Sequence, residues 1–222
     1  MSAAAPRGTA SIVYLHGFSS SPRSTKAQFL AERLREHGIS LRCPDFNEPS
    51  FTSLTMTRML AHLEADLDAA SGPSTLIGSS LGGTLALLAA ARFTARIDRL
   101  VLLAPAVMFA RPGHHILPPE RIAEWRTKGT LPFFHYGYGA DRPLDFAFYE
   151  DSLLYDVFAA RVIQPALVFQ GLRDTLVDPQ SVQLFTSDRP NSRLVLLDDD
   201  HQLTASLPQI WSDMLSFLAL SA

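Results

Sequence analysis

The feature that most constrains the fold of this sequence is a regular alternation between short apolar runs and segments with helical periodicity. The runs are rich in leucine and β-branched residues, and several are apolar at almost every position, as strands buried on both faces of a parallel sheet are. They comprise residues 11–15, 39–43, 74–77, 99–103, 166–169 and 193–197. This alternation predicts an α/β fold with a mostly parallel sheet of about six strands and helices on both faces.

Helical periodicity appears between the runs as apolar residues at positions i, i+3, i+4 and i+7, which places them on one face of a helix. The pattern occurs at Ala27, Leu30, Ala31 and Leu34, at Met56, Met59, Leu60 and Leu63, and at Leu207, Ile210, Trp211, Met214, Leu215 and Leu218. Ser206 and Gln209 have the spacing of a capping box. We therefore expect the last helix to begin a few residues after His201.

The composition is that of a folded globular protein rather than a disordered one, since 47% of the 222 residues are hydrophobic and 18% are charged. A net charge of -3 leaves no excess of basic residues to neutralise phosphates, so a nucleic-acid partner is not expected. Cys43 is the only cysteine. It cannot form an intramolecular disulfide, and no C-x-x-C motif is present, which favours a reducing, cytoplasmic location.

Two stretches bear on secretion and on membranes. Residues 1–10 contain no apolar core of a secretory signal and are expected to form a loose tail. Residues 69–91 are uncharged over a length that exceeds a membrane span, but glycines, serines and Pro73 interrupt them. No membrane-spanning segment is therefore expected.

The alternation breaks between residues 106 and 160. This stretch is rich in proline and glycine, shows no clear strand and contains 11 of the 21 aromatic residues. We expect a single domain over residues 1–222 in which this stretch is a cap insertion after the fourth strand. The alternative is a pair of helices packed on the core, because aromatic residues are usually buried for packing alone.

A G-x-S-x-G motif lies between the third run and an apolar helical segment. It reads Gly78-Ser-Ser80-Leu-Gly82, and with 12 glycines and 21 serines in 222 residues chance gives roughly 0.06 such matches. A serine in this strand-to-helix turn sits in strained backbone with its hydroxyl projecting above the sheet, and its neighbours must be small. Ser80 is therefore the candidate nucleophile. The alternative is a glycine-rich turn whose serine only caps the helix.

A serine nucleophile needs a histidine base oriented by a carboxylate, and both follow in order. Asp174 comes after the fifth run and His201 after the sixth, so both are expected at the carboxyl edge of the sheet, where the sites of open α/β sheets collect. Asp178 precedes Pro179 and is instead expected to cap a helix. Residues 198–200 are too close to His201 in sequence to reach its Nδ1 side easily.

The negative oxygen that forms during acyl transfer needs two backbone N–H donors. One is expected from Leu81, directly after the nucleophile, and the other from Phe18 in the loop after the first run. Gly17 allows the backbone to approach a substrate there. His16 is interpreted as a brace that holds this loop by hydrogen bonds.

These motifs resemble those of the α/β-hydrolase superfamily over nearly the whole chain. The resemblance rests on His16-Gly17, the turn at Ser80, the segment from Gly171 to Asp174, and His201 after Asp200. Within that superfamily, residues 14–27 and 77–83 are similar to the small bacterial YqiA-like esterases. The resemblance implies hydrolysis of carboxylic esters or thioesters through an acyl-serine. Residues 106–160 look more like the mobile cap of acyl-protein or glucuronide-ester hydrolases of the superfamily.

The ordered set of Ser80, Asp174 and His201 leads to the hypothesis of a metal- and cofactor-independent serine hydrolase that acts on a small-molecule ester or acyl substrate. Its aromatic-rich cap is expected to bind an apolar acyl or aromatic group. The expected lining residues are Trp125, Phe133, Phe134 and Tyr136. The competing hypotheses are a catalytically silent binding protein on the same fold, and a peptidase or amidase, which would use the same acyl-enzyme. A monomer or a homodimer is expected.

Overall fold

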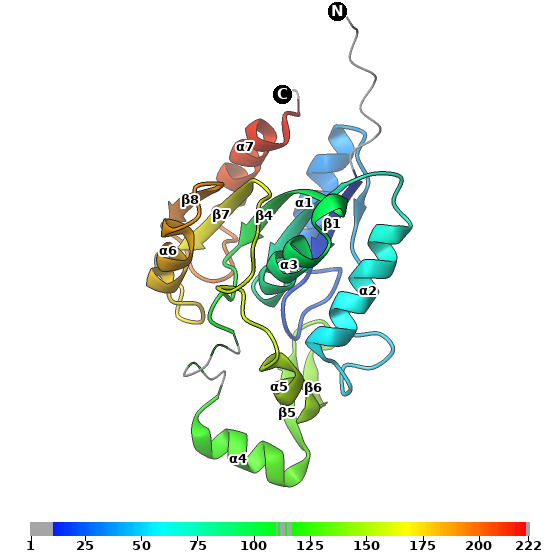
Figure 1. The fold of residues 1–222 in the computed structure, drawn as a ribbon, viewed down its shortest axis with the longest axis vertical. Coiled ribbons are helices and arrows are strands. Elements are labelled where there is room, and N and C mark those ends of the chain that lie inside the picture. The colour runs from blue at the N-terminus through cyan, green and yellow to red at the C-terminus, as the bar shows by residue number, and fades with distance from the viewer. Residues whose placement is uncertain (1–10, 110, 112–113, 115–116, 221–222) are drawn as a thin grey trace, which may run out of the picture.

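The structure is a computed structural model that describes residues 11–109, 111, 114 and 117–220. A six-stranded sheet crosses its centre in the order β2-β1-β3-β4-β7-β8, and every pairing of neighbouring strands in it is parallel (Figure 1). The strands are β1 Ser11–Leu15, β2 Leu41–Arg42, β3 Ser74–Ser79, β4 Ile97–Leu103, β7 Ala166–Gly171 and β8 Ser192–Leu197. Each of the six predicted runs contributes one strand, which confirms the predicted sheet.

Helices cover both faces of this sheet, and the strands are apolar on both sides for that reason. The helices on one face are α1 Thr25–Glu36 and α7 Leu207–Leu218, and those on the other are α2 Met56–Asp68, α3 Leu81–Arg92 and α6 Pro179–Ser187. A short 3₁₀ helix, η1 Thr94–Arg96, leads into β4. Along β1, Ile12 and Tyr14 pack with the first group, while Val13 and Leu15 pack with the second, because successive side chains of a strand point to opposite faces.

The starts of two helices test the capping predictions. Asp178 accepts a hydrogen bond from the Gln180 N–H at 3.1 Å and Pro179 opens α6, so its predicted role as a helix cap is confirmed. α7 begins directly after Ser206, but the Ser206 side chain makes no capping bond, and the capping-box interpretation is wrong. The Ser206 N–H instead donates to Asp199 Oδ2 at 2.9 Å, which fastens the start of this helix to the loop before it.

Residues 106–160, which we call the cap, lie between β4 and β7 in the chain, and their labelled helices and strands lie at the lower end of Figure 1. Their elements are α4 Pro119–Lys128, an antiparallel hairpin of β5 Thr130–His135 and β6 Ala140–Asp145, and α5 Ala147–Ser152. The expectation of no strand here is wrong. Pro132 and Pro143 lie opposite each other in the hairpin and obscure its strand pattern. Proline is tolerated because each strand of an isolated hairpin has an edge that needs no ladder donor.

The centre of the cap is an aromatic cluster around Trp125. This side chain is fully buried, and its Nε1–H donates to the Leu144 carbonyl oxygen at 2.8 Å. The ring centroids of Phe133, Phe146 and Tyr149 lie 5.1 Å, 5.7 Å and 6.3 Å from that of Trp125. The cluster is continuous with the core on the α2 and α3 side of the sheet. Packing therefore accounts for part of the aromatic content of the cap.

No helix within the described ranges is long and apolar enough to cross a membrane. The uncharged stretch 69–91 instead supplies the turn before β3, the strand itself and most of α3. The expected N-terminal tail, residues 1–10, lies outside the described residues.

Candidate active site

Ser80 stands between the end of β3 and the start of α3, in a backbone conformation that few side chains adopt. Its φ is 53° and its ψ is -116°, and a conformation of this kind costs about 1–3 kcal/mol. The Ser80 N–H donates to the Leu103 carbonyl, and the Ser80 carbonyl accepts from the N–H groups of Gly83, Thr84 and Ala106. The surrounding chain therefore imposes the strained turn that the motif predicted.

Glycine is required on both sides of this turn. A Cβ at Gly78 would collide with the Gly82 carbonyl, and a Cβ at Gly82 would collide with the Leu15 carbonyl at the end of β1. α3 therefore passes so close to the ends of β1 and β3 that no side chain fits between them. This agrees with the predicted need for small residues two positions before and after Ser80.

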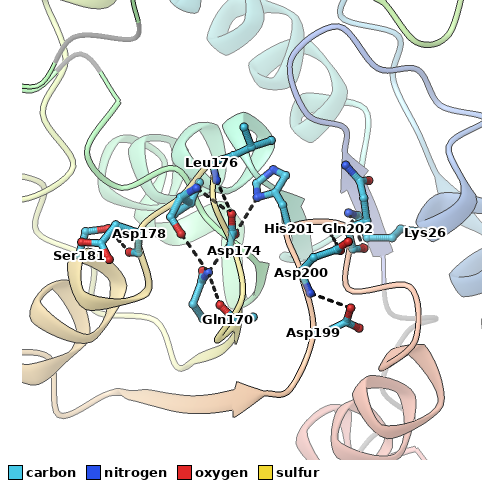
Figure 2. A network of polar contacts seen from close by, with 12 residues as sticks. Lys26, Gln170, Asp174, Leu176, Asp178, Ser181, Asp199, Asp200, His201 and Gln202 are labelled. Carbon is cyan, nitrogen blue, oxygen red and sulfur yellow. Dashed lines mark hydrogen bonds and ion pairs between the residues drawn. The ribbon is translucent and has the colours of Figure 1, made fainter.

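Asp174 and His201 follow the neighbouring parallel strands β7 and β8, so the fold brings them to one edge of the sheet. His201 Nδ1 lies 2.8 Å from Asp174 Oδ2, and Figure 2 shows the imidazole turned towards the carboxylate. Asp174 Oδ1 also accepts from the N–H groups of Leu176 and Val177, each at 2.8 Å, and Oδ2 accepts from Gln170 Nε2 at 3.0 Å. The carboxylate is therefore fixed from every side, with no exposed surface.

The hydrogen bonds of Asp174 keep it ionised. Burial raises the pKa of the Asp174 carboxyl, but the bonds from His201, Val177 and Gln170 outweigh burial and hold the pKa below its usual value. An anionic Asp174 selects the His201 tautomer that carries its proton on Nδ1 and leaves Nε2 free to accept one.

The three aspartates before His201 bind groups other than its ring, as their closeness in sequence indicated. Asp198 pairs with Arg173 on the surface. Asp199 Oδ1 accepts from the Asp200 N–H, and Asp200 Oδ1 accepts from the Gln202 N–H, both at 2.8 Å. Asp199 and Asp200 therefore shape the turn that carries His201, and Asp174 alone occupies its Nδ1 side within the described residues.

Ser80 and His201 line one cavity of about 860 Å³. Within the described ranges, no hydrogen bond joins the Ser80 hydroxyl to the His201 ring, so the structure joins Asp174 to His201 and places Ser80 at the same cavity. Catalytic hydrogen bonds often tighten only when substrate binds. A smaller hollow of about 260 Å³ lies beyond the opposite end of β3 and contains none of the predicted site residues.

The two expected oxyanion donors flank Ser80. Leu81 begins α3, and Phe18 follows Gly17, where an added Cβ would lie 3.4 Å from the Ser80 Cβ. Neither the Phe18 nor the Leu81 N–H donates to another group in the part of the chain that the structure describes. The positive end of α3 adds to the attraction for a negative oxygen beside Ser80.

Hydrogen bonds of His16 hold the loop after β1, in agreement with the bracing role that the sequence indicated for this residue. His16 Nδ1 lies 2.9 Å from the Gly17 carbonyl oxygen, and its Nε2 accepts from the Phe46 N–H at 3.1 Å. His16 Nε2 also lies 3.5 Å from Asp45 Oδ1, so the ring connects this loop to residues 45–46.

The same loop is held by the cap, which the sequence did not indicate. The Tyr136 N–H donates to the Ser19 carbonyl, and Asn47 Nδ2 donates to the Ser20 carbonyl, both at 2.9 Å. His135 is fully buried, and its Nε2 lies 3.1 Å from Asn47 Oδ1. The hairpin of β5 and β6 therefore fastens the loop that carries Phe18, through partners more than 80 residues away in the chain.

The structure divides the expected substrate-binding residues. Phe133, Phe134 and Tyr136 line the cavity, but Trp125 does not. Its indole N–H needs a buried acceptor, which it finds at Leu144, so Trp125 belongs to the interior of the cap and its expected lining position is corrected. The lining also includes residues that the sequence patterns did not indicate, among them the exposed Leu176 and the buried Lys26. Neither belongs to a motif that indicates a site.

Among the described residues, no three His, Cys, Asp or Glu side chains gather in a way that could hold a metal ion. That the reaction needs no metal ion stays an expectation.

A parallel sheet of this order, with a serine at a strained strand-to-helix turn and an Asp–His pair after the last two strands, defines an α/β-hydrolase. The solved structure of Est1E from Butyrivibrio proteoclasticus with bound ferulic acid has this fold, with a TM-score of 0.81, 23% identity, and coverage of 96% of this chain and 91% of that one. Alpha/beta hydrolase domain-containing protein 10 from mouse aligns with a TM-score of 0.78, 24% identity, and coverage of 96% and 92%. At these identities the likeness shows the fold.

Residues 11–219 match the sequence model of the Uncharacterised protein family UPF0227, and the chain belongs to that family. The predicted resemblance to the YqiA-like proteins of the α/β-hydrolase superfamily is thereby confirmed. A curated relative, the mouse mitochondrial palmitoyl-protein thioesterase ABHD10, is 28% identical over 193 residues, which cover 82% of this chain. The chain spans 64% of the length of that relative.

Proposed function

We propose that this protein is a serine hydrolase that cleaves carboxylic esters or thioesters through an acyl-enzyme on Ser80. The observation that carries the proposal is the 2.8 Å contact between Asp174 and His201, at the same cavity as a serine in a strained strand-to-helix turn. The name of the curated relative, a palmitoyl-protein thioesterase, supports ester or thioester cleavage.

In the proposed reaction, His201 Nε2 takes the proton of the Ser80 hydroxyl while the oxygen attacks the acyl carbon. Asp174 stabilises the imidazolium that forms. The Phe18 and Leu81 N–H groups bind the negative oxygen of the tetrahedral intermediate, and one such donor contributes about 2.7–4 kcal/mol to the transition state. The intermediate collapses and expels an alcohol or thiol, which receives its proton from His201. Water then attacks the acyl-serine with His201 as base and releases the acid.

The cavity suggests how a substrate lies. Phe133, Phe134, Tyr136 and Leu176 give the cavity apolar surface, much of it open to solvent, with Tyr136 75% exposed. We place the acyl group of the substrate against these side chains, because apolar surface binds apolar groups. The lining also carries hydroxyl groups, among them those of Ser21, Ser24 and Thr204, which suit a polar leaving group.

A fluorophosphonate probe and a series of p-nitrophenyl esters of increasing acyl length test the proposal. We expect covalent labelling of the wild type, and loss of both labelling and turnover in Ser80→Ala. Ser71→Ala is the matched control, because Ser71 is an exposed serine in the turn before β3. Persistent turnover in Ser80→Ala would contradict the mechanism. An unlabelled, inactive wild type would favour the catalytically silent binding protein, and amide turnover would favour a peptidase or amidase.

Three further expectations stay predictions. They are the cytoplasmic location, the monomeric or homodimeric state, and the organisation of residues 1–222 as one domain with a cap at 106–160.

A further inference from the structure

Lys26 is a buried lysine beside the proposed general base, and the proposed mechanism does not use it. It is the second residue of α1, it is 8% exposed, and it lines the same cavity as Ser80 and His201. Its Nζ donates a hydrogen bond to the carbonyl oxygen of Gln202 at 2.9 Å (Figure 2). Gln202 directly follows His201, so this contact joins α1 to the turn that carries the base.

The turn that carries His201 is held on both sides of Gln202. Asp200 Oδ1 accepts from the Gln202 N–H at 2.8 Å, while Lys26 binds the carbonyl of the same residue. The next residue, Leu203, is fully buried and has a φ of 54°. Backbone in this region keeps its shape only where the surrounding contacts impose it. The contact from Lys26 comes from a residue 176 positions earlier in the chain.

Packing alone does not explain a lysine at this position. Burial of an ammonium group is costly unless the charge is paired, and a methionine would fill a similar volume without that cost. The charge of Lys26 is attracted by three carboxylates, those of Asp200, Asp174 and Asp199, which lie on the turns after β7 and β8. These carboxylates therefore offset part of the cost of burying the cation beside the turn that carries His201.

We propose that Lys26 is a positioning residue for His201: its ammonium group binds the Gln202 carbonyl and fixes the turn of residues 200–203 so that the imidazole serves Ser80. The inference rests on the proposed function, because this positioning matters only where His201 is the base. Lys26 itself does not touch the reacting atoms.

The positioning contact depends on the charge of Lys26. Burial lowers the pKa of the Lys26 ammonium to about 8, against the attraction of Asp200, Asp174 and Asp199. Above that pH the neutral amine binds a carbonyl more weakly and no longer attracts the carboxylates. The other ionisable side chains around this part of the cavity are His201, Arg23 in the loop before α1, and Tyr14 on β1, whose pKa burial raises to about 12.

The test is the pH profile of ester hydrolysis for the wild type, Lys26→Met and Lys26→Arg. We expect wild-type kcat to fall as pH rises through about 8. Lys26→Met lowers kcat about tenfold at neutral pH with little change in KM, and its profile lacks that fall. Lys26→Arg keeps its charge, so it retains most of the activity and also lacks the fall. Lys128→Met is the matched control, because Lys128 is the only other lysine and is 62% exposed on α4.

Thermal unfolding separates positioning from a structural role. The pKa of Lys26 is lower in the folded state than its ordinary 10.5, so the folded chain binds this proton less tightly, and stability rises with pH between about 8 and 10.5. Removal of the buried charge should therefore leave Lys26→Met at least as stable as the wild type at neutral pH, although it turns over more slowly. The positioning role would be overturned if Lys26→Met unfolded at a lower temperature than the wild type and Lys26→Arg restored the stability but not the rate.

Two further outcomes distinguish this inference from the proposed function. If the fluorophosphonate labels Ser80 and the wild type hydrolyses esters, but Lys26→Met keeps the wild-type kcat and profile, the positioning role alone is wrong. If the wild type is neither labelled nor active, the proposed function is wrong and the inference with it. If Lys26→Met does not fold, the test rests on the wild type and Lys26→Arg. Identical pH profiles of kcat, with a fall near pH 8 in both proteins, would overturn the inference.

Discussion

The two halves of the candidate site are built in different ways. On the sheet side, Asp174 and His201 lie on turns that follow adjacent strands, and local hydrogen bonds hold each of them. On the cap side, the loop of Phe18 is held by a hairpin that lies more than 100 residues later in the chain. The difference teaches that Asp174 and His201 are held mainly by the turns after two adjacent strands, with one further contact from Lys26 on α1, whereas the loop of Phe18 is held in part by an insertion.

The two halves also differ in how many of their buried polar atoms lack a hydrogen-bond partner. The Asp174 carboxylate has a hydrogen-bond partner for each oxygen. Ser19 Oγ and His135 Nδ1, both on the cap side, are buried without a partner in the described part of the chain, and so is Gln170 Oε1 on the sheet side. Unpaired buried atoms cost stability, so we expect the cap side to be the less rigid half.

The largest expected effect is on the sheet side. Asp174→Asn keeps the shape of the side chain but removes the charge that selects the His201 tautomer, so kcat should fall by about 10⁴. Ester turnover under saturating substrate measures it. Asp198→Asn is the matched control, because Asp198 pairs only with Arg173 on the surface. Equal activity of the two variants would remove Asp174 from the mechanism.

The next effect is on the stability of the cap. Trp125→Ala deletes a fully buried ring together with its hydrogen bond to the Leu144 carbonyl, so the free energy of unfolding should fall by about 3–5 kcal/mol. Urea denaturation measures it, with Trp125→Phe as a milder control. If Trp125 instead contacted substrate, KM would change in both variants while stability stayed constant.

Asn47→Ala tests the dependence of the oxyanion loop on the cap. It removes the bond to the Ser20 carbonyl and the partner of His135, so kcat should fall about 10-fold to 100-fold at nearly constant KM. Asn191→Ala also removes side-chain hydrogen bonds to backbone carbonyls, those of Val162 and Gln164. They lie far from the site, so this variant should affect stability only. Equal loss of kcat in both variants would mean that Asn47 acts through general stability.

The smallest effect concerns acid stability. The pKa of Asp174 is lowered by folding, so its ionised form stabilises the protein above the ordinary pKa of about 3.9, and this contribution is lost as pH falls through the lower folded value. The unfolding free energy of the wild type should therefore decline more steeply below about pH 4 than that of Asp174→Asn. Denaturant titrations at several pH values measure the two slopes. Parallel slopes would show that this carboxylate carries no such linkage.

The sequence was informative wherever function depends on neighbours in the chain. The turn at Ser80 needs glycines two positions away, and parallel strands end at one edge, so Ser80, Asp174 and His201 could be predicted as candidates from local patterns. The β5–β6 hairpin was missed because Pro132 and Pro143 hide its period. The position of Lys26 at the cavity and that of Trp125 in the interior of the cap could not be predicted, for another reason. Whether a side chain faces the cavity or the interior depends on packing between distant segments, which no local pattern encodes.

The hydrogen bond that the Ala106 N–H donates to the Ser80 carbonyl has a practical consequence for chimaeras. The cap begins at residue 106, and the Thr84 hydroxyl also donates to the Ala106 carbonyl at 2.9 Å. The first residue of the insertion is thus part of the scaffold that holds Ser80. A cap transplanted from another hydrolase should therefore be joined after this residue, so that the exchange alters specificity without disturbing the serine.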